Sequence, residues 1–391
     1  MSNIFETIKQ LISGNPFYDN DLYKNAKSIE DYPVLEKKDI ISYLNNCSLK
    51  GSNYKTFYTS GSTGTPLKIT WTNADYIKSI ASLWRWRNRY GITSKDCCLT
   101  CHSSMLMNGS LSNELIHIYD NYISFSKLHF SHGKLDEFIN YIRIFSPKWI
   151  YAQPSFVYQL AIYLKEYAPD LLNQFKHIEL VGEMVDPFVK KQIQSMFSSA
   201  TVVVMYGMQE FNSVMVEENN YMVVCSDNVY VEILDDNNVP CNLDEEGNIV
   251  VTGLKNTLMP LVRYNTLDRG KKSIIEGKEC FIITQGRAND WFEYNGDLYD
   301  GSLFFNVITK YNSTHSQQIS KFQVVQEADS LIFNVFGFDG LPCRNDIEHD
   351  ISYLLNNDYN VFLPIFVNIV CSFSEFIHGT NKTKYFIKKG Y

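Results

Sequence analysis

A loop rich in hydroxyls and glycines, YTSGSTGTPLK at residues 58–68, lies between two β-prone segments. Gly61 and Gly64 let the backbone turn and come close to a ligand. The other side chains and backbone N–H groups suit anionic oxygens such as those of phosphate. The hydroxyls belong to Thr59, Ser60, Ser62, Thr63 and Thr65, and Lys68 adds a positive charge. The common P-loop differs, because Lys and Ser or Thr directly follow its second glycine. The composition therefore predicts either a phosphate-binding loop or an ordinary surface turn.

Further charged residues follow predicted strands or open the last β-rich region. They are Glu183, Glu210, Asp268 and Arg287. Ligands of open α/β sheets bind beyond the carboxyl ends of the strands, so we expect function in these loops. Each loop alone resembles a plain turn, and only the ordered set indicates a site.

One cluster has the spacing of half a metal site, at Cys97, Cys98, Cys101 and His102. Tetrahedral zinc needs four ligands, and no second Cys/His cluster with suitable spacing follows. We therefore interpret these cysteines as small buried apolar residues. His102 is interpreted as a structural histidine, with a substrate contact as the alternative.

Strand and helix signals alternate in the middle of the chain, which predicts βαβ units around a parallel sheet. The expected elements are helices at 135–145, 156–167 and 186–197 and strands at 149–152, 177–181 and 201–205. Before them, 73–90 has the periodicity of one amphipathic helix. Short β runs at 223–262 and a helix near 347–356 complete the pattern. We expect an α/β fold with a large N-terminal domain, including a small β subdomain, and a small α+β C-terminal domain.

The overall composition excludes several classes of protein. With 391 residues, 45% of them hydrophobic, the chain can bury a large core. A net charge of −8 argues against a protein devoted to binding nucleic acid. The most apolar run, 361–370, is too short to span a bilayer, and the N-terminus does not resemble a secretory signal. Nine cysteines without such a signal predict a reduced, cytoplasmic protein.

Taken together, the motifs resemble those of the adenylate-forming superfamily of acyl- and aryl-coenzyme A ligases. Within it, the chain is most similar to the phenylacetate–coenzyme A ligase-like branch, which includes capsule-locus homologues. The resemblance rests on the loop at 58–68 and on segments that follow it in the expected order. These are YAQPS at 151–155, GE at 182–183, YGMQE at 206–210, MPLVRY at 259–264, GR at 286–287 and NK at 381–382.

The resemblance implies a nucleotide site. In this family the hydroxyl-rich loop holds the β- and γ-phosphates of ATP. Gly182 and Glu183 correspond to the lining of the adenine pocket. Tyr206, followed by Gly207, corresponds to the aromatic residue that stacks on the base.

The resemblance also implies the residues that handle charge. Glu210 corresponds to the carboxylate that binds Mg²⁺, and Asp268 to the acid that accepts hydrogen bonds from the ribose hydroxyls. Arg287 corresponds to the contact with ribose and phosphate, and Lys382 to the mobile catalytic lysine. Asp290 is the expected hinge between domains at 1–289 and 290–391.

The acyl pocket is expected between the segment 101–109 and the loop after Tyr206. His102, Met208 and Phe211 are its candidate substrate residues. Methionine and aromatic side chains suit an apolar or aromatic acid, but they fill protein cores equally well.

Three positions depart from the family pattern. Gln209 replaces Thr or Ser before the glutamate, Leu267 replaces the glycine before the ribose-binding aspartate, and Asn381 replaces the glycine before the lysine. ATP binding is expected to survive these changes, while thioester formation is the step they put in question.

The expected activity is ATP-dependent activation of a small carboxylic acid, with Mg²⁺, through an acyl-adenylate. Coenzyme A is the expected thiol acceptor. One alternative is transfer to the phosphopantetheine arm of an acyl carrier protein or to a sugar amine, and another is nucleotide binding without catalysis. An acyl carrier protein or a downstream transferase is among the expected partners. Dimers occur among relatives, so a homodimer is among the expected assemblies.

Overall fold

The computed structural model describes most of the chain. The described residues are 2–46, 53–58, 67–102, 105–107, 110–112, 116–126, 132–285, 291–295, 297–300, 302–338, 340–371, 375–376 and 386–388. The chain divides into two compact units, Met1–Gly91 with Val204–Asn289 and Ile92–Val203 with Asp290–Tyr391. Each unit therefore combines two stretches that lie far apart in the sequence.

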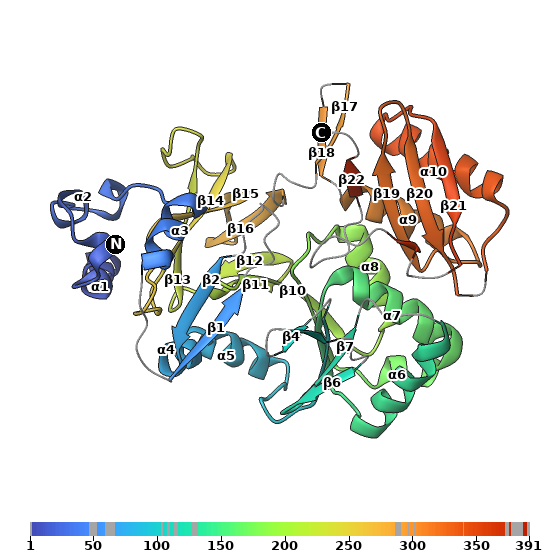
Figure 1. Cartoon of the computed structure of the whole chain (residues 1–391), viewed down its shortest axis with the longest axis horizontal. Coiled ribbons are helices and arrows are strands. Elements are labelled where there is room, and N and C mark those ends of the chain that lie inside the picture. Colours follow the sequence, from blue (N-terminus) through green and yellow to red (C-terminus); the bar gives the residue numbers. More distant parts are fainter. Residues whose placement is uncertain are drawn as a thin grey trace. The chain divides into compact units, whose positions relative to one another are not determined.

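The first unit begins with a layer of short helices, drawn in blue in Figure 1. They are α1 Ser2–Ile12, η1 Pro16–Tyr18, α2 Asp21–Lys24, η2 Ile29–Asp31 and α3 Lys37–Asn46. The rings of Tyr18 and Tyr23 meet edge to face, with centroids 4.7 Å apart. The Tyr18 hydroxyl donates to the Pro260 carbonyl at 2.7 Å and accepts from the Val262 N–H at 3.3 Å. The layer thus fixes the chain that leads into strand β15.

An antiparallel sheet forms the rest of this unit's framework, with the strand order β13–β14–β15–β16–β12–β11–β10. The strands are β10 Thr201–Met208, β11 Asn212–Glu218, β12 Tyr221–Val224, β13 Val229–Leu234, β14 Glu246–Gly253, β15 Tyr264–Ile275 and β16 Lys278–Gln285. A hairpin of β1 Tyr54–Tyr58 and β2 Lys68–Thr72 contributes Ile69 and Trp71 to the same core as Ile249 and Val251. The predicted β region is confirmed, and it extends to Gln285.

The prediction of a single helix at 73–90 is wrong in one respect, because the structure has two helices there. The structure has α4 Asn73–Ser79 and α5 Ala81–Arg89, with Ile80 between them at φ −99° and ψ −1°. The Ser79 hydroxyl donates to the Tyr76 carbonyl at 2.7 Å, and such back-bonding competes with the helical backbone ladder. Helical periodicity could not reveal this break, since both pieces keep the same period.

The second unit contains the predicted parallel sheet, with the strand order β9–β8–β3–β7–β6. Its strands are β3 Cys98–His102, β6 Ile116–Tyr119, β7 Tyr122–Ser126, β8 Trp149–Ala152 and β9 His177–Val181. All pairs are parallel except β6 with β7. Its helices are α6 His132–Phe145, α7 Pro154–Tyr167, η4 Pro169–Asn173 and α8 Pro187–Met196. A separate small pair, β4 Met105–Met107 and β5 Ser110–Ser112, is antiparallel.

The C-terminal part of this unit has its own hydrophobic core. Its sheet has the order β21–β20–β19–β22, and α9 and α10 lie beside it in Figure 1. The elements are β17 Trp291–Tyr294, β18 Asp297–Asp300, α9 Ser302–Thr314, β19 Lys321–Gln326, β20 Leu331–Phe336, α10 Arg344–Tyr359, β21 Ile365–Ile369 and β22 Phe386–Lys388. Among the helices in the described ranges, none combines the length and apolar character needed to cross a bilayer.

Candidate functional site

Part of the predicted site lies outside the described residues. This holds for Thr59, Ser60, Gly61, Ser62, Thr63, Gly64, Arg287, Asp290, Asn381 and Lys382, and for the side chain of His102. The two ends of the hydroxyl-rich loop are described, and Tyr58 pairs with Lys68 across the β1–β2 hairpin. Lys68 is exposed, while the neighbouring Leu67 and Ile69 are buried in the core. The loop is therefore anchored on both sides by paired strands.

A tight hairpin between β10 and β11 carries Tyr206, Gly207 and Glu210. The strand register shifts between Tyr206 and Gly207, and Met208 pairs with Asn212. At Gly207, an added Cβ would lie 2.3 Å from the Asn212 carbonyl oxygen, so only glycine fits there. The hairpin thus requires this glycine for its backbone geometry.

Tyr206 and Asp268 are brought together, as the resemblance implies for two residues of one nucleotide site. The Tyr206 hydroxyl donates to Asp268 Oδ2 at 2.6 Å, and the Asp268 side chain is largely buried. A short bond to a carboxylate is stronger than one between neutral groups. The bond fixes the direction of the Asp268 carboxylate.

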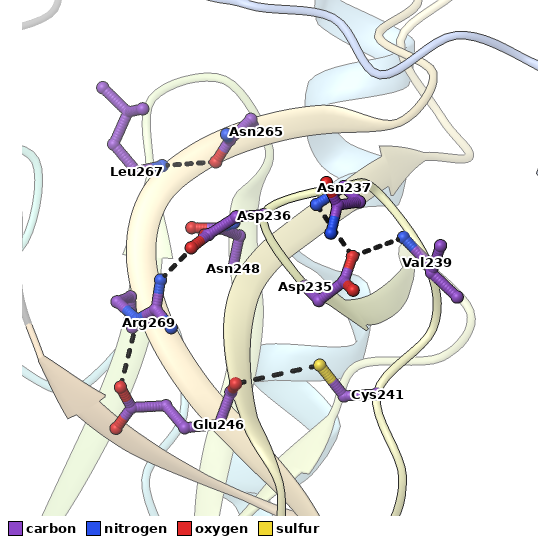
Figure 2. A network of polar contacts seen from close by, with 10 residues as sticks. All are labelled: Asp235, Asp236, Asn237, Val239, Cys241, Glu246, Asn248, Asn265, Leu267 and Arg269. Atoms are coloured by element: carbon purple, nitrogen blue, oxygen red, sulfur yellow. Dashed lines mark hydrogen bonds and ion pairs between the residues drawn. The ribbon is translucent and has the colours of Figure 1, made fainter.

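The backbone around Asp268 is unusual. Leu267 has φ +65°, in the left-handed region that favours glycine. Its N–H donates to Asn265 Oδ1 at 3.0 Å, as Figure 2 shows. The Asp268 N–H donates to the Thr266 hydroxyl at 3.2 Å, and the strand register of β15 shifts after Asp268, between Arg269 and Gly270. Such a turn suits the glycine that the resemblance implies at this position, and Leu267 adopts the left-handed backbone without being glycine.

The polar network in Figure 2 holds β14 and β15 together near Leu267. Arg269 Nε donates to Glu246 at 3.0 Å, and Arg269 Nη1 donates to Asp236 at 3.3 Å. Asp236 also accepts from Asn248 Nδ2 at 3.2 Å. These contacts lie at the surface, so each stabilises the fold only weakly, but together they fix the strand that carries Asp268.

Glu210 is buried, with 4% of its surface exposed. The Tyr264 hydroxyl donates a long hydrogen bond, of 3.5 Å, to Glu210 Oε1. The neighbouring Met208 is half-buried, and Phe211 lies in the core beside Tyr264, with ring centroids 6.1 Å apart. The proposed substrate contacts of Met208 and Phe211 remain predictions.

In the second unit, the Gly182–Glu183 segment is tied to the start of α7. Gly182 has φ +80°, which favours glycine. The two carboxylate oxygens of Glu183 accept from the Ser155 N–H at 3.2 Å and the Ser155 hydroxyl at 3.0 Å. The N-cap residue Gln153 makes no side-chain capping bond, so the Glu183 carboxylate satisfies the helix end instead.

The cysteine cluster behaves as small apolar residues. Cys98 is fully buried, and Cys97 and Cys101 pack against the core of the second unit. Burial raises the pKa of the Cys97 thiol, which disfavours the thiolate that binds metals. Within the described part of the chain, no group of three or more His, Cys, Asp or Glu could hold a metal ion.

Sequence reasoning missed two supporting groups. The guanidinium of Arg263 binds Glu232 through two hydrogen bonds, at 3.1 and 3.0 Å, and donates to the carbonyls of Glu30 and Tyr32. This buried pair joins the N-terminal helices to the start of β15. Arg263 is part of the motif at 259–264, so the sequence indicated that it matters. The second group is the buried side-chain amide of Asn228, which donates hydrogen bonds to the Glu210 hairpin and which nothing in the sequence indicated.

Comparison with known proteins identifies the family. A family model described as AMP-binding enzyme matches residues 10–259, so the chain belongs to this family of the adenylate-forming superfamily. Among curated proteins, no sequence matches the chain.

Solved structures of adenylate-forming enzymes share the fold. The chain is similar to 2-hydroxyisobutyryl-CoA ligase in its postadenylation state, with 19% identity, a TM-score of 0.73, and coverage of 99% of this chain and 89% of that one. It is also similar to the anthranilate CoA ligase AuaEII in complex with anthranoyl-AMP, with 14% identity, a TM-score of 0.53, and coverage of 81% and 62%. O-succinylbenzoate coenzyme A synthetase from Bacillus subtilis gives 16% identity, a TM-score of 0.50, and coverage of 82% and 66%. The predicted α/β fold with a small C-terminal domain is confirmed.

Proposed function

We propose that this chain is an ATP-dependent ligase that activates a small carboxylic acid as its acyl-adenylate and transfers the acyl group to coenzyme A. The main support is the 2.6 Å bond between the Tyr206 hydroxyl and Asp268, in a chain of the AMP-binding family. Glu210 lies on the same hairpin as Tyr206. One element would then present an aromatic ring to the base, orient the ribose-binding acid and supply a carboxylate for metal.

The first half-reaction joins two negatively charged partners. A carboxylate oxygen of the acid attacks the α-phosphorus of ATP, the bond from that phosphorus to the bridging oxygen breaks, and pyrophosphate leaves. Because an anion attacks a polyanion, the site must align the reactants and offset the developing charge. The residues proposed to do so are Thr59, Ser60, Ser62, Thr63 and Lys68 at the leaving phosphates, Arg287 at ribose and phosphate, and Lys382 between the carboxylate and the α-phosphate.

Glu210 suits a magnesium ion. Mg²⁺ takes oxygen ligands and is commonly held by one or two carboxylates together with substrate phosphates, and a buried carboxylate meets that need. When bound, the ion would neutralise charge on the pyrophosphate. The Tyr264 hydroxyl beside Glu210 Oε1 would help to keep the carboxylate in place.

In the second half-reaction the sulfur of coenzyme A attacks the acyl carbon, the bond to AMP breaks, and the thiol proton passes to solvent. We propose that residues 1–289 bind ATP and the acid and that 290–391 form a mobile lid hinged at Asp290. A hydrophobic core formed within residues 292–386 supports this division, while Phe336 and Val370 pack in the core of residues 99–202. The named activities of the 2-hydroxyisobutyryl-CoA and anthranilate CoA ligases support coenzyme A as acceptor.

The finer assignment also remains a proposal. The ordered motifs favour the phenylacetate–coenzyme A ligase-like branch, with a role in capsule or other polysaccharide biosynthesis and a cytoplasmic location. Gly182 and Glu183 would line the adenine pocket, and His102, Met208 and Phe211 the acyl pocket. A homodimer is the proposed assembly.

The direct test incubates the purified protein with ATP, Mg²⁺ and a panel of aromatic, aliphatic and amino acids, and measures pyrophosphate release and hydroxylamine-trapped acyl product. We expect at least one acid to give both signals. Lys382→Ala should abolish them, and Lys384→Ala, two residues along the same segment, serves as the matched control. No signal with any acid would refute the ligase and leave the nucleotide-binding alternative.

A second measurement identifies the acceptor. With the active acid, added coenzyme A should yield the thioester, detected by mass spectrometry. A mass shift of an acyl carrier protein, without any coenzyme A product, would show that the acceptor is a phosphopantetheine arm.

A further inference from the structure

One buried amide binds the carbonyls on both sides of Asn212, the first residue of β11 in the Glu210 hairpin. Asn228 has 2% of its surface exposed. Its Nδ2 donates to the Phe211 carbonyl at 2.8 Å and to the Ser213 carbonyl at 2.6 Å. An amide nitrogen carries two hydrogens, so these two bonds use its full donor capacity.

The backbone that Asn228 holds is in an uncommon conformation. Asn212, between the two bonded carbonyls, has φ +61°. Asparagine adopts this left-handed geometry more readily than most residues with a Cβ, and contacts from the surroundings help to fix it there. The amide of Asn228 is one such constraint, and it acts directly after Glu210 in the chain.

Asn228 is itself fixed in place. Its N–H donates to the Cys225 carbonyl at 2.8 Å, and its carbonyl accepts from the Leu254 N–H at 2.9 Å. On the other side of the hairpin, Asn212 Nδ2 donates to the Ser79 hydroxyl at 2.7 Å, and the Ser213 hydroxyl donates to the Ser79 carbonyl at 2.9 Å. The hairpin is therefore clamped between α4 and the turn that precedes β13.

We infer that Asn228 is a positioning residue for Glu210: it holds the hairpin in the conformation that places the Glu210 carboxylate for Mg²⁺ and ATP phosphates. The link between Asn228 and Mg²⁺ binding rests on the proposed function, whereas the effect of Asn228 on the conformation of the hairpin is independent of it. The amide nitrogen bonds the backbone carbonyls of Phe211 and Ser213, so it would act on Glu210 through the backbone of residues 211–213.

The chain offers a matched control for this amide. Asn312, on α9, is also 2% exposed, and its Nδ2 donates to the Ile319 carbonyl at 2.8 Å while its Oδ1 accepts from the Ile319 N–H at 2.7 Å. Asn228→Asp places a carboxylate oxygen against two carbonyl oxygens, and Asn312→Asp places one against the Ile319 carbonyl. Both variants lose buried hydrogen bonds, and only the first of the two positions contacts the Glu210 hairpin. Asn228→Ser, which retains one donor, is a milder variant should Asn228→Asp not fold.

The experiment measures hydrogen exchange of the peptides covering 205–216, Mg²⁺ affinity in the presence of a non-hydrolysable ATP analogue, and thermal stability, in the full-length chain. Asn228→Asp or Asn228→Ser should speed exchange in 205–216 and weaken Mg²⁺ binding about tenfold, or about 1.4 kcal/mol. Asn312→Asp should lower the melting temperature without either effect.

Three outcomes would overturn the inference or its parts, and a fourth would overturn the proposed function. Unchanged exchange at 205–216 in the folded Asn228 variants would refute the positioning role. Faster exchange with unchanged Mg²⁺ affinity would refute the link to Glu210. A wild-type protein that binds the nucleotide analogue but no Mg²⁺ would refute the metal role of Glu210 and hence of Asn228, whereas one that binds neither would refute the proposed function.

Discussion

The left-handed backbone at Leu267 predicts which of two variants, Leu267→Gly or Leu267→Ala, is the more stable. Leu267 has φ +65° and a side chain that is 43% exposed. For a residue with a Cβ, this conformation costs about 1–2 kcal/mol. Glycine avoids the cost but loses about 0.5–1 kcal/mol through the entropy of the unfolded chain. Leu267→Gly should therefore be more stable than Leu267→Ala by about 0.5–1 kcal/mol.

Comparing glycine with alanine at one position removes most of the effect of the lost leucine side chain, since both variants lack it. Ile274 provides the control, because it lies on the same strand, β15, and is 48% exposed. It is not among the positive-φ residues. In an ordinary strand, alanine is more stable than glycine by about 0.5–1 kcal/mol, so the order at Ile274 should be the reverse.

The assay is urea unfolding of the four variants, followed by tryptophan fluorescence and by circular dichroism. The expected result is opposite orders at the two positions. If alanine is the more stable residue at both positions, the left-handed turn before Asp268 does not exist in solution, and the explanation of the family's glycine fails. Leu267→Gly should also keep its affinity for ATP, because glycine preserves the turn that orients Asp268.

Three further predictions concern single contacts. Tyr206→Phe removes the 2.6 Å bond to Asp268 and should weaken binding of an ATP analogue about tenfold in calorimetry; an affinity equal to that of wild type would show that the bond does not orient the carboxylate. Glu183→Gln removes the charge at the start of α7 and should lower the free energy of unfolding by about 1 kcal/mol in urea, whereas equal stability would exclude the capping role. Backbone N–H groups of the following turn hold the pKa of Asp235 below its ordinary value, so its stabilising contribution is present above that ordinary value and is lost as the pH falls through the lowered one. Asp235→Asn should flatten the acid limb of a stability profile, and an unchanged limb would contradict this.

The periodicity of the sequence predicted much of the second unit. The strands at 149–152 and 177–181 match β8 and β9, because short apolar runs bounded by turns leave few alternatives. The break at Ile80 and the clamp formed by Asn228 could not be predicted in this way. Both depend on side chains that bond to backbone groups, and Asn228 reaches carbonyls that lie 15 and 17 residues away. Such long-range polar contacts leave no periodic signal in one sequence.

The order of the motifs led us to predict that these residues share one site, but it could not show how each side chain is held. The pairing of Tyr206 with Asp268 spans 62 positions, and it arises because β10 and β15 belong to one antiparallel framework. For Glu183, the structure shows a partner that the motifs did not predict. The motif assigned it to a pocket, while the structure shows its carboxylate bonded to Ser155, a residue that the motif included without a role.

The structure shows the surroundings of two of the three departures from the family pattern, Gln209 in the β10–β11 hairpin and Leu267 in the turn before Asp268. Gln209 is exposed, and its backbone carbonyl accepts from Trp71 Nε1 at 3.4 Å, a contact that does not depend on its side chain. Because that contact uses the backbone carbonyl, we expect Thr or Ser at this position to keep it and to add the missing hydroxyl. Leu267 likewise keeps the left-handed turn at a cost in stability. A loss of rate caused by Gln209 should consequently appear at the chemical step, with nucleotide affinity unchanged, and Gln209→Thr should raise the rate of adenylate formation without tightening ATP binding.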